Sequence, residues 1–428
     1  MRYLLIFLLF TISRLNIQAQ NNTIHKSGNA ASNGFSEEKL KRIDNLMQQA
    51  VDKNWIKGAV GFIAHNGTIV YNKAFGIDDV NKNTPMKTDL IFRIASQTKA
   101  ITSVAAMMLF EEGKFLLDDP ISKYIPSFKN PRVLDRFNPK DTTYTTKPAK
   151  REITFRDLLT HTSGIDYPQI GSKKMRAIYA KADITVAFSD KKRSQVDDIN
   201  KLGTLPLVAQ PGEKFIYSAS TDVLGRLVEI ISGMSLDNFF HTKIFKPLGM
   251  NDTYFYLPQA KQSRLVKVYT EDPKTHEPVL WQQNTMPGAT VDYPINKDDY
   301  YSGGGGLVST IQDYAVFLQM LLNSGEYNGH RLLATHTVEI MTKNQIGDIR
   351  VTFDNQKFGL GFAITTKKGR LKREQSAGTF WWGGIFGTMY WCDPKEKIVA
   401  QLYTQQLPSS HAKKFAAKYK TLVYQALN

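Results

Sequence analysis

The stretch that decides the fold is IFRIASQTKAITSVAAMMLFEEGKFLLDDP, residues 91–120. A serine and a lysine, Ser96 and Lys99, stand three positions apart, and an apolar run then continues to Gly113. Its apolar residues recur at the 3.6-residue period of a helix: Ile101, Val104, Ala105, Met108 and Leu109. The pattern predicts a mostly buried helix over about 96–113 with Ser96 at its start.

On such a helix, Lys99 would lie on the same face as Ser96, one turn further on. A serine hydroxyl is a poor nucleophile unless a neighbouring base takes its proton, and an apolar helix face favours the neutral amine that can do so. The helix N-terminus adds backbone N–H groups that favour developing negative charge. Ser-x-x-Lys is also frequent by chance in a chain with 55 Lys and Arg, so distant residues must decide.

Strand patterns cluster at both ends of the chain. Two apolar runs, about 58–65 and 68–75, flank Asn66-Gly67, the dipeptide that most strongly favours a two-residue hairpin. FGLGFAITT, GTFWWGGIFGTMYWCD and KIVAQLYTQ have strand patterns near the C-terminus. A helix capped by Ser36 precedes the first strands, and an amphipathic helix over about 411–427 ends the chain.

The middle of the chain is mainly helical in pattern, and residues 130–152, rich in Lys, Thr and Pro, predict an inserted loop. We therefore predict an α/β (α+β) fold, in which an antiparallel sheet is flanked by the N- and C-terminal helices and an all-helical lobe is inserted. Residues 36–428 would form a single domain, with the α/β lobe at about 36–115 and 310–428 and the helical lobe at about 116–309.

Residues 1–20, MRYLLIFLLFTISRLNIQAQ, have the pattern of a secretory signal. Arg2 precedes an apolar run, which is too short for a permanent anchor, and Ala19 stands where a peptidase could cut. An uncleaved anchor is the alternative interpretation. Residues 21–35 are polar and predict a flexible lead-in. We expect export to the periplasm or the medium, with no stable membrane anchor after the signal is removed.

Composition argues against several classes of partner and cofactor. The net charge of +16 is spread along the chain without a zinc-finger or RNA-binding motif, so we expect a solvated basic surface and no nucleic-acid partner. The eight His show no metal-binding spacing, and the single Cys392 is expected to be a buried hydrophobe. With no dinucleotide fingerprint and no Gly-x-Ser-x-Gly, we expect no metal, no cofactor and no α/β-hydrolase nucleophile elbow.

A nucleophilic serine also needs a group that hands a proton to the leaving atom, and a tyrosine beside the lysine can do this. Tyr217, in PGEKFIYSASTDVLG, is the candidate because it follows the turn Pro211-Gly212 and precedes a helix. Taken alone, it is more often a surface or core residue.

Ser96-Gln97-Thr98-Lys99, PGEKFIYSASTDVLG, SGGGGLVST and WWGGIFGT occur in an order that resembles the serine β-lactamase-related family. The resemblance covers about residues 37–425, includes LLTHTSG and KPLGM, and is to the class C β-lactamase, D-alanyl-D-alanine peptidase and family-eight carboxylesterase branch. It implies a β-lactamase/transpeptidase-like fold with the active site between the two lobes.

Carried over, the resemblance makes Ser96 the acylated nucleophile, Lys99 the neighbouring base and Tyr217 the tyrosine of the second motif. The oxyanion hole would be the backbone N–H groups of Ser96 and Ile385. Trp382, Gly383 and Gly384, the third motif, would bind substrate. Which of Lys99 and Tyr217 takes the serine proton stays open.

Two positions depart from the β-lactamase and peptidase pattern. Ala219 stands where an asparagine is typical, and Trp382 stands where a lysine or histidine is typical. A tryptophan cannot supply the cation that holds a substrate carboxylate. Both departures resemble the esterase branch, as do Tyr217-Ser218 and the following Asp222.

The sequence therefore predicts an exported serine hydrolase that forms a Ser96 acyl-enzyme with carboxylic esters or small amides. The first alternative is a β-lactamase or D-alanyl-D-alanine carboxypeptidase with the same nucleophile. The second is a binding protein of the same fold that has lost the chemistry. The expected partner is a small-molecule ester, amide or β-lactam-like substrate, and the sequence does not give the oligomeric state.

Overall fold

The structure is a computed structural model that describes residues 27–189, 191–282, 285, 288–351, 356–370 and 374–428. The predicted signal, residues 1–20, lies outside the described residues. Residues 27–35 of the predicted lead-in are packed rather than free, because Gly28 N–H bonds Ile69 O at 3.0 Å and Phe35 is buried. In the described residues, no helix combines the length and apolar character that a membrane crossing requires.

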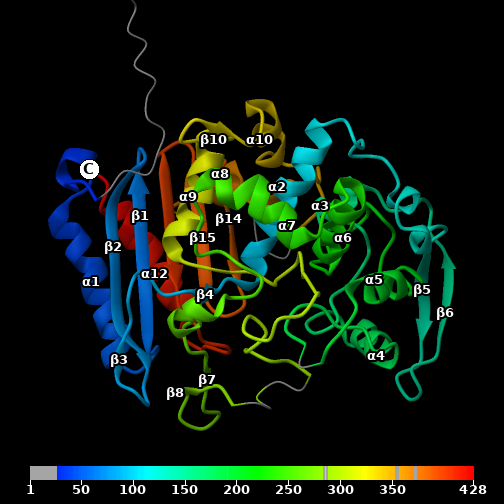
Figure 1. The fold of residues 1–428 in the computed structure, drawn as a ribbon, viewed down its shortest axis with the longest axis horizontal. Coiled ribbons are helices and arrows are strands. Elements are labelled where there is room, and N and C mark those ends of the chain that lie inside the picture. The colour runs from blue at the N-terminus through cyan, green and yellow to red at the C-terminus, as the bar shows by residue number, and fades with distance from the viewer. Residues whose placement is uncertain (1–26, 190, 283–284, 286–287, 352–355, 371–373) are drawn as a thin grey trace, which may run out of the picture.

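An eight-stranded antiparallel sheet runs through one side of the molecule, and both ends of the chain build it (Figure 1). In spatial order its strands are β12 (Gln356–Phe358), β13 (Ala363–Thr365), β14 (Phe380–Gly384), β15 (Thr388–Asp393), β16 (Ile398–Tyr403), β1 (Gly58–His65), β2 (Thr68–Asp79) and β3 (Thr84–Pro85). The last long strand, β16, therefore pairs with the first, β1. Segments from the two ends of the chain thus form one continuous sheet.

Helices cover both faces of the sheet, because alternate side chains of each strand point to opposite sides. On β16, Ile398 and Ala400 pack with α1 (Glu37–Asp52) and α12 (Ala412–Gln425), whereas Val399 and Tyr403 join the core that contains α2 (Thr98–Glu111) and α9 (Ile311–Leu322). The sheet is thus flanked by the N- and C-terminal helices, as predicted.

Local signals in the sequence set the first elements. Ser36 caps α1 by accepting a hydrogen bond from Lys39 N–H at 3.3 Å. Asn66 and Gly67 both have positive φ, 48° and 77°, which the two-residue turn between β1 and β2 requires. Both predictions are confirmed, and β2 extends to Asp79, four residues further than expected from its pattern.

The segment between the two halves of the sheet is mainly helical. Its helices are α3 (Phe155–Leu159), α4 (Lys173–Lys181), α5 (Gln195–Gly203), α6 (Ser220–Ser232), α7 (Leu236–Phe240) and α8 (Lys246–Leu248), with a π-helical turn at His241–Phe245. Helix α6 packs against α2, which places α2, the helix that follows Ser96, between the sheet and this segment (Figure 1).

The prediction that this lobe is all-helical is wrong in detail. It also contains two short hairpins, β5 (Arg132–Phe137) with β6 (Tyr144–Pro148), and β7 (Tyr269–Glu271) with β8 (Pro278–Leu280). The first replaces the loop predicted at 130–152. Its second strand is exposed or half-buried throughout, so no alternation of apolar and polar residues marks it in the sequence.

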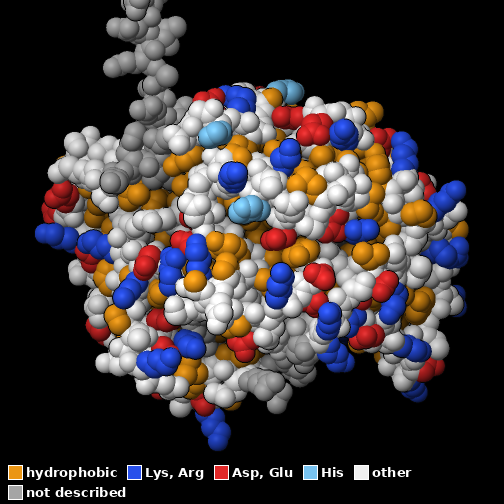
Figure 2. Space-filling view, in the orientation of Figure 1, with side chains coloured by type: hydrophobic (Ala, Val, Ile, Leu, Met, Phe, Trp, Pro, Cys, Tyr) orange, Lys and Arg blue, Asp and Glu red, His pale blue; other side chains and the backbone are white. Residues whose placement is uncertain are grey.

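Short elements outside the main sheet complete the fold. They are the pairs β4 (Phe92–Arg93) with β9 (Val308–Ser309) and β10 (Glu326–Tyr327) with β11 (His330–Arg331), and the helices α10 (Thr335–Met341) and α11 (Lys367–Arg370). The β4–β9 pair ties the segment before Ser96 to the end of the glycine run at 303–306. On the face drawn in Figure 2, Lys and Arg are interspersed with Asp and Glu.

Candidate active site

Ser96 lies in a short 3₁₀ turn, Ala95–Gln97, directly before α2. The sequence predicted that the helix starts at about Ser96, whereas the α-helix begins at Thr98. The first residue of this turn, Ala95, has a φ of 45°, which is left-handed and uncommon for a residue with a side chain. Such a conformation persists only where the surrounding structure enforces it, and it is frequent at active sites. The turn places Ser96 on the wall of a cavity.

Lys99, in the first turn of α2, is 2% exposed, and its ammonium group points back to Ser96. Its Nζ donates to Ser96 Oγ at 3.3 Å and to the backbone oxygen of Gly304 at 2.6 Å. The same Nζ lies 4.9 Å from the ring centre of Tyr217 and 5.3 Å from that of Tyr167. A buried cation needs such partners, and these contacts hold the amine next to the hydroxyl it would activate.

Tyr217 lies in the loop before α6, and its hydroxyl donates to Ser96 Oγ at 2.7 Å. Its ring packs 5.2 Å from that of Trp382 on β14 and 5.6 Å from that of Tyr167. The structure thus brings Ser96, Lys99 and Tyr217 together at one oxygen, although more than a hundred positions separate the tyrosine from the serine.

The loop that carries Tyr217 is held by His161, in the segment after α3. His161 O accepts from Ile216 N–H at 2.8 Å, and its Nδ1 is 3.2 Å from Ser218 Oγ. Burial lowers the pKa of His161 well below its ordinary value, and the nearby Lys99 lowers it further, so the imidazole is neutral. His161 has a φ of 55° and shapes a turn.

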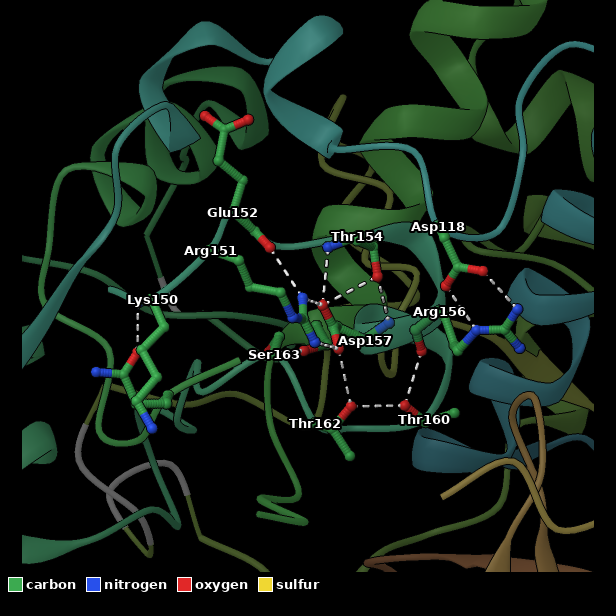
Figure 3. Close-up of polar contacts among 12 residues, drawn as sticks. Asp118, Lys150, Arg151, Glu152, Thr154, Arg156, Asp157, Thr160, Thr162 and Ser163 are labelled. Atoms are coloured by element: carbon green, nitrogen blue, oxygen red, sulfur yellow. Dashed lines mark hydrogen bonds and ion pairs between the residues drawn. The ribbon is translucent and has the colours of Figure 1, made fainter. Parts of the chain in front are cut away.

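A network of polar contacts around Asp157 fixes this turn (Figure 3). The carboxylate receives two hydrogen bonds from Arg151, at 2.5 and 2.9 Å, and one each from Thr154 N–H and Thr162 Oγ1. Thr162 Oγ1 is 2.8 Å from Thr160 Oγ1, so the residues on both sides of His161 are tied together. Asp157 is 3% exposed, and sequence reasoning assigned it no role.

The third motif approaches Ser96 through its backbone. A side chain at Gly384 would place its Cβ 2.3 Å from Ile94 O and 2.4 Å from Thr388 Oγ1, so only glycine allows the end of β14 to lie this close. Trp382, Gly383, Gly384 and Ile385 line the cavity together with Ser96. The oxyanion hole at Ser96 N–H and Ile385 N–H stays a prediction.

The cavity beside Ser96 has a volume of about 450 Å³, and its described wall residues carry no formal charge. One group of contacting rings contains Tyr167, Tyr217, Trp381 and Trp382, and another contains Phe188, Trp281 and Phe386. An apolar site of this size suits the neutral body of a small molecule, whereas it offers a carboxylate no cation.

Two residues of the site were not identified from the sequence. Gly304 O receives the Lys99 ammonium, and Tyr167 lies beneath it. The glycine run gave no indication of a partner for a cation, because backbone acceptors leave no side-chain signature in a sequence. The Cys392 thiol is buried, as expected, and burial raises its pKa well above the ordinary value. Within the described residues, no cluster of His, Cys, Asp and Glu has the form of a metal site.

Comparison with known proteins gives relatives over most of the chain. The beta-lactamase family profile matches residues 43–425. Protein Rv1367c of Mycobacterium tuberculosis is 32% identical over 377 residues, 85% of this chain and 89% of the relative. Esterase EstB of Burkholderia gladioli is 28% identical over 365 residues, which cover 82% of this chain and 86% of EstB. Relatives from Escherichia coli and Salmonella carry a provisional assignment as D-alanyl-D-alanine carboxypeptidases.

Among solved structures, EstCE1, described as a hydrolase with promiscuous acyltransferase activity, matches with a TM-score of 0.79 and 26% identity, over 91% of this chain and 99% of EstCE1. The fold and its relatives define a serine hydrolase. The chain belongs to the beta-lactamase family, which confirms the resemblance and the fold predicted from the sequence.

The contribution of the Asp157 network to folding can be measured as a change in the free energy of unfolding. We expect Asp157→Ala to lower the free energy of unfolding by about 2 kcal/mol or more, because it removes the carboxylate that completes the capping box with Thr154 and leaves Arg151 without its main partner. Urea denaturation measures the change. Asp118→Ala is the matched control, since Asp118 also pairs with an arginine, Arg156, but is 70% exposed. Its loss should cost less than about 1 kcal/mol, and equal effects of the two changes would contradict the assignment.

Proposed function

We propose that this serine hydrolase acts on neutral carboxylic esters with apolar acyl groups, through an acyl-enzyme at Ser96. The observation that carries the proposal is the cavity beside Ser96, whose described walls are apolar and uncharged. The relationship to EstB and EstCE1 supports it.

The contacts suggest how the reaction proceeds. Ser96 Oγ attacks the ester carbonyl carbon while its proton passes to the pair formed by Lys99 and Tyr217, both within hydrogen-bond distance. The tetrahedral oxyanion would be held by Ser96 N–H and Ile385 N–H. As the C–O bond to the alcohol breaks, the pair returns the proton to the leaving oxygen. Water then attacks the acyl-enzyme by the same route and releases the acid.

The two alternatives make different demands on the site. A β-lactam or a D-alanyl-D-alanine peptide carries a carboxylate, and the walls described here offer it Trp382 in place of a cation. A binding protein without chemistry would not need Ser96 Oγ within 2.7 Å of a tyrosine hydroxyl and 3.3 Å of a buried ammonium. The contacts therefore favour an ester hydrolase over both.

Acyl transfer to an alcohol is a second candidate function. The two groups of rings along the cavity give an apolar acyl chain and an apolar alcohol separate walls. An alcohol bound where the first alcohol left would accept the acyl group by the reverse of the acylation step. The similarity to EstCE1, described as a hydrolase with promiscuous acyltransferase activity, supports this second candidate. Formation of a new ester when a short alcohol is added to the hydrolysis assay would establish it.

Substrate selectivity follows from the apolar walls. Each methylene buried by the acyl chain contributes about 0.8 kcal/mol, so kcat/KM for p-nitrophenyl esters should rise about fourfold per added carbon until the cavity is filled. A chromogenic cephalosporin, which carries a carboxylate, should be hydrolysed far more slowly. Faster turnover of the cephalosporin than of every ester in the series would assign the protein to the β-lactamase alternative.

Ser96→Ala should lower ester turnover at least about a thousandfold, because the nucleophile is removed. Ser103→Ala is the matched control, since Ser103 is a buried serine of α2, the helix that follows Ser96, and lies against Gly361 and not the cavity. Its activity should stay within about twofold of wild type. Ester turnover that survives Ser96→Ala would exclude the proposed acyl-enzyme.

We also propose that the protein is exported, on the pattern of residues 1–20. When the full chain is expressed in a bacterium with two membranes, the periplasmic or extracellular product should lack its first residues and begin close after Ala19. N-terminal sequencing of the purified protein measures this. A product that retains Met1 and stays in the membrane fraction would support the uncleaved anchor.

A further inference from the structure

Asp222 is a fully buried carboxylate near the base of the active site, in the first turn of α6. Its exposed fraction is 0%, and one oxygen, Oδ2, has no hydrogen-bond partner. A buried carboxylate with an unpaired oxygen is costly, so its presence in a folded protein calls for an explanation. The mechanism described above leaves Asp222 without a role.

The other carboxylate oxygen holds the glycine run at 303–306. Asp222 Oδ1 accepts from Ser302 Oγ at 2.5 Å and from Gly304 N–H at 3.1 Å. A side chain at Gly304 would place its Cβ 2.2 Å from Asp222 Oδ2, so the carboxylate packs directly on this backbone. The turn at Gly304 is therefore shaped around Asp222.

Gly304 also contacts Lys99, the proposed base of the reaction. Gly304 donates its N–H to Asp222, and Gly304 O accepts the Lys99 ammonium at 2.6 Å. Lys99 in turn donates to Ser96 Oγ. Gly304 thus lies between the buried carboxylate of Asp222 and the buried ammonium of Lys99. Its carbonyl is one of the contacts that hold Lys99 beside Ser96.

We propose that Asp222 is a positioning residue with two effects on Lys99. Its hydrogen bonds fix Gly304, whose carbonyl seats the ammonium beside Ser96, and its negative charge balances the positive charge of Lys99 inside the protein. The inference rests on the proposed role of Ser96 as nucleophile and is independent of which ester the protein hydrolyses.

Two opposing effects act on the Asp222 carboxylate. Burial raises its pKa above the ordinary value, and Lys99, Ser302 and Gly304 N–H offset part of that rise by favouring the charged form. Two tyrosines also face the carboxylate, Tyr167 and Tyr300, and burial raises the pKa of both hydroxyls well above the ordinary value, with Asp222 adding to the rise. Both tyrosines stay neutral, so Lys99 is the cation that responds to Asp222.

Replacing the carboxylate by an amide separates charge from geometry. In Asp222→Asn, the side-chain oxygen can still accept from Ser302 and Gly304 N–H, while the negative charge is gone. Without that charge, the positive charge of Lys99 is no longer balanced, so the protonated form of the active site becomes less stable. Ser302→Ala does the opposite, since it keeps the charge and weakens the anchor.

The readout is the rate at which a fluorophosphonate labels Ser96 as a function of pH, which reports the nucleophile without any ester substrate. For Asp222→Asn, we expect the rising limb of the rate profile to move about one pH unit lower. For Ser302→Ala, we expect the plateau rate to fall about tenfold with the limb in place. Thermal unfolding of each variant shows whether it is folded.

Asp313→Asn is the matched control, because Asp313 is a buried carboxylate that accepts from Asp252 N–H and Thr253 Oγ1 and not from the glycine run. Its profile should match wild type. A folded Asp222→Asn variant whose profile does not move would overturn the inference and leave Asp222 a structural residue. If wild type is not labelled at Ser96 at all, the proposed function fails and with it the ground for the inference.

Discussion

The structure around the active site depends on one constraint, the need to satisfy the buried ammonium of Lys99. An unpaired charge in this environment would cost several kcal/mol. Four parts of the chain meet to prevent this: the turn at Ser96, the glycine run through Gly304 O, and the rings of Tyr217 and Tyr167. The strained turn at Ala95 and the close packing of Gly384 follow from bringing these segments to the same point.

The contrast between the reacting centre and its cavity explains the chemistry that the protein favours. Polar and charged groups are concentrated at Ser96 Oγ, whereas the described walls around it are aromatic and aliphatic. Hydrogen bonds and charges act more strongly where water is scarce, so such walls increase the effect of the few polar contacts on the reacting carbonyl. Binding and reaction thus use different parts of the site: apolar area holds the substrate, and three side chains act on it.

Much of this arrangement could be predicted from the sequence, because it rests on local patterns. The Ser36 cap, the Asn66-Gly67 turn and the periodicity of α2 each follow from a few neighbouring residues. The order of four motifs gave the family and the trio of side chains. The β5–β6 hairpin, the Asp157 network and the contact between Gly304 and Lys99 could not be predicted, since they depend on exposed strands, on distant partners and on backbone atoms.

The pairing of β16 with β1 also governs the order in which the protein can become active. The strands that complete the sheet, including the Trp382-Gly383-Gly384 edge beside Ser96, are the last parts of the chain to be synthesised. Contacts between such distant segments are slow to form. The serine and its lysine are therefore made early but lack their finished surroundings until almost the whole polypeptide has emerged.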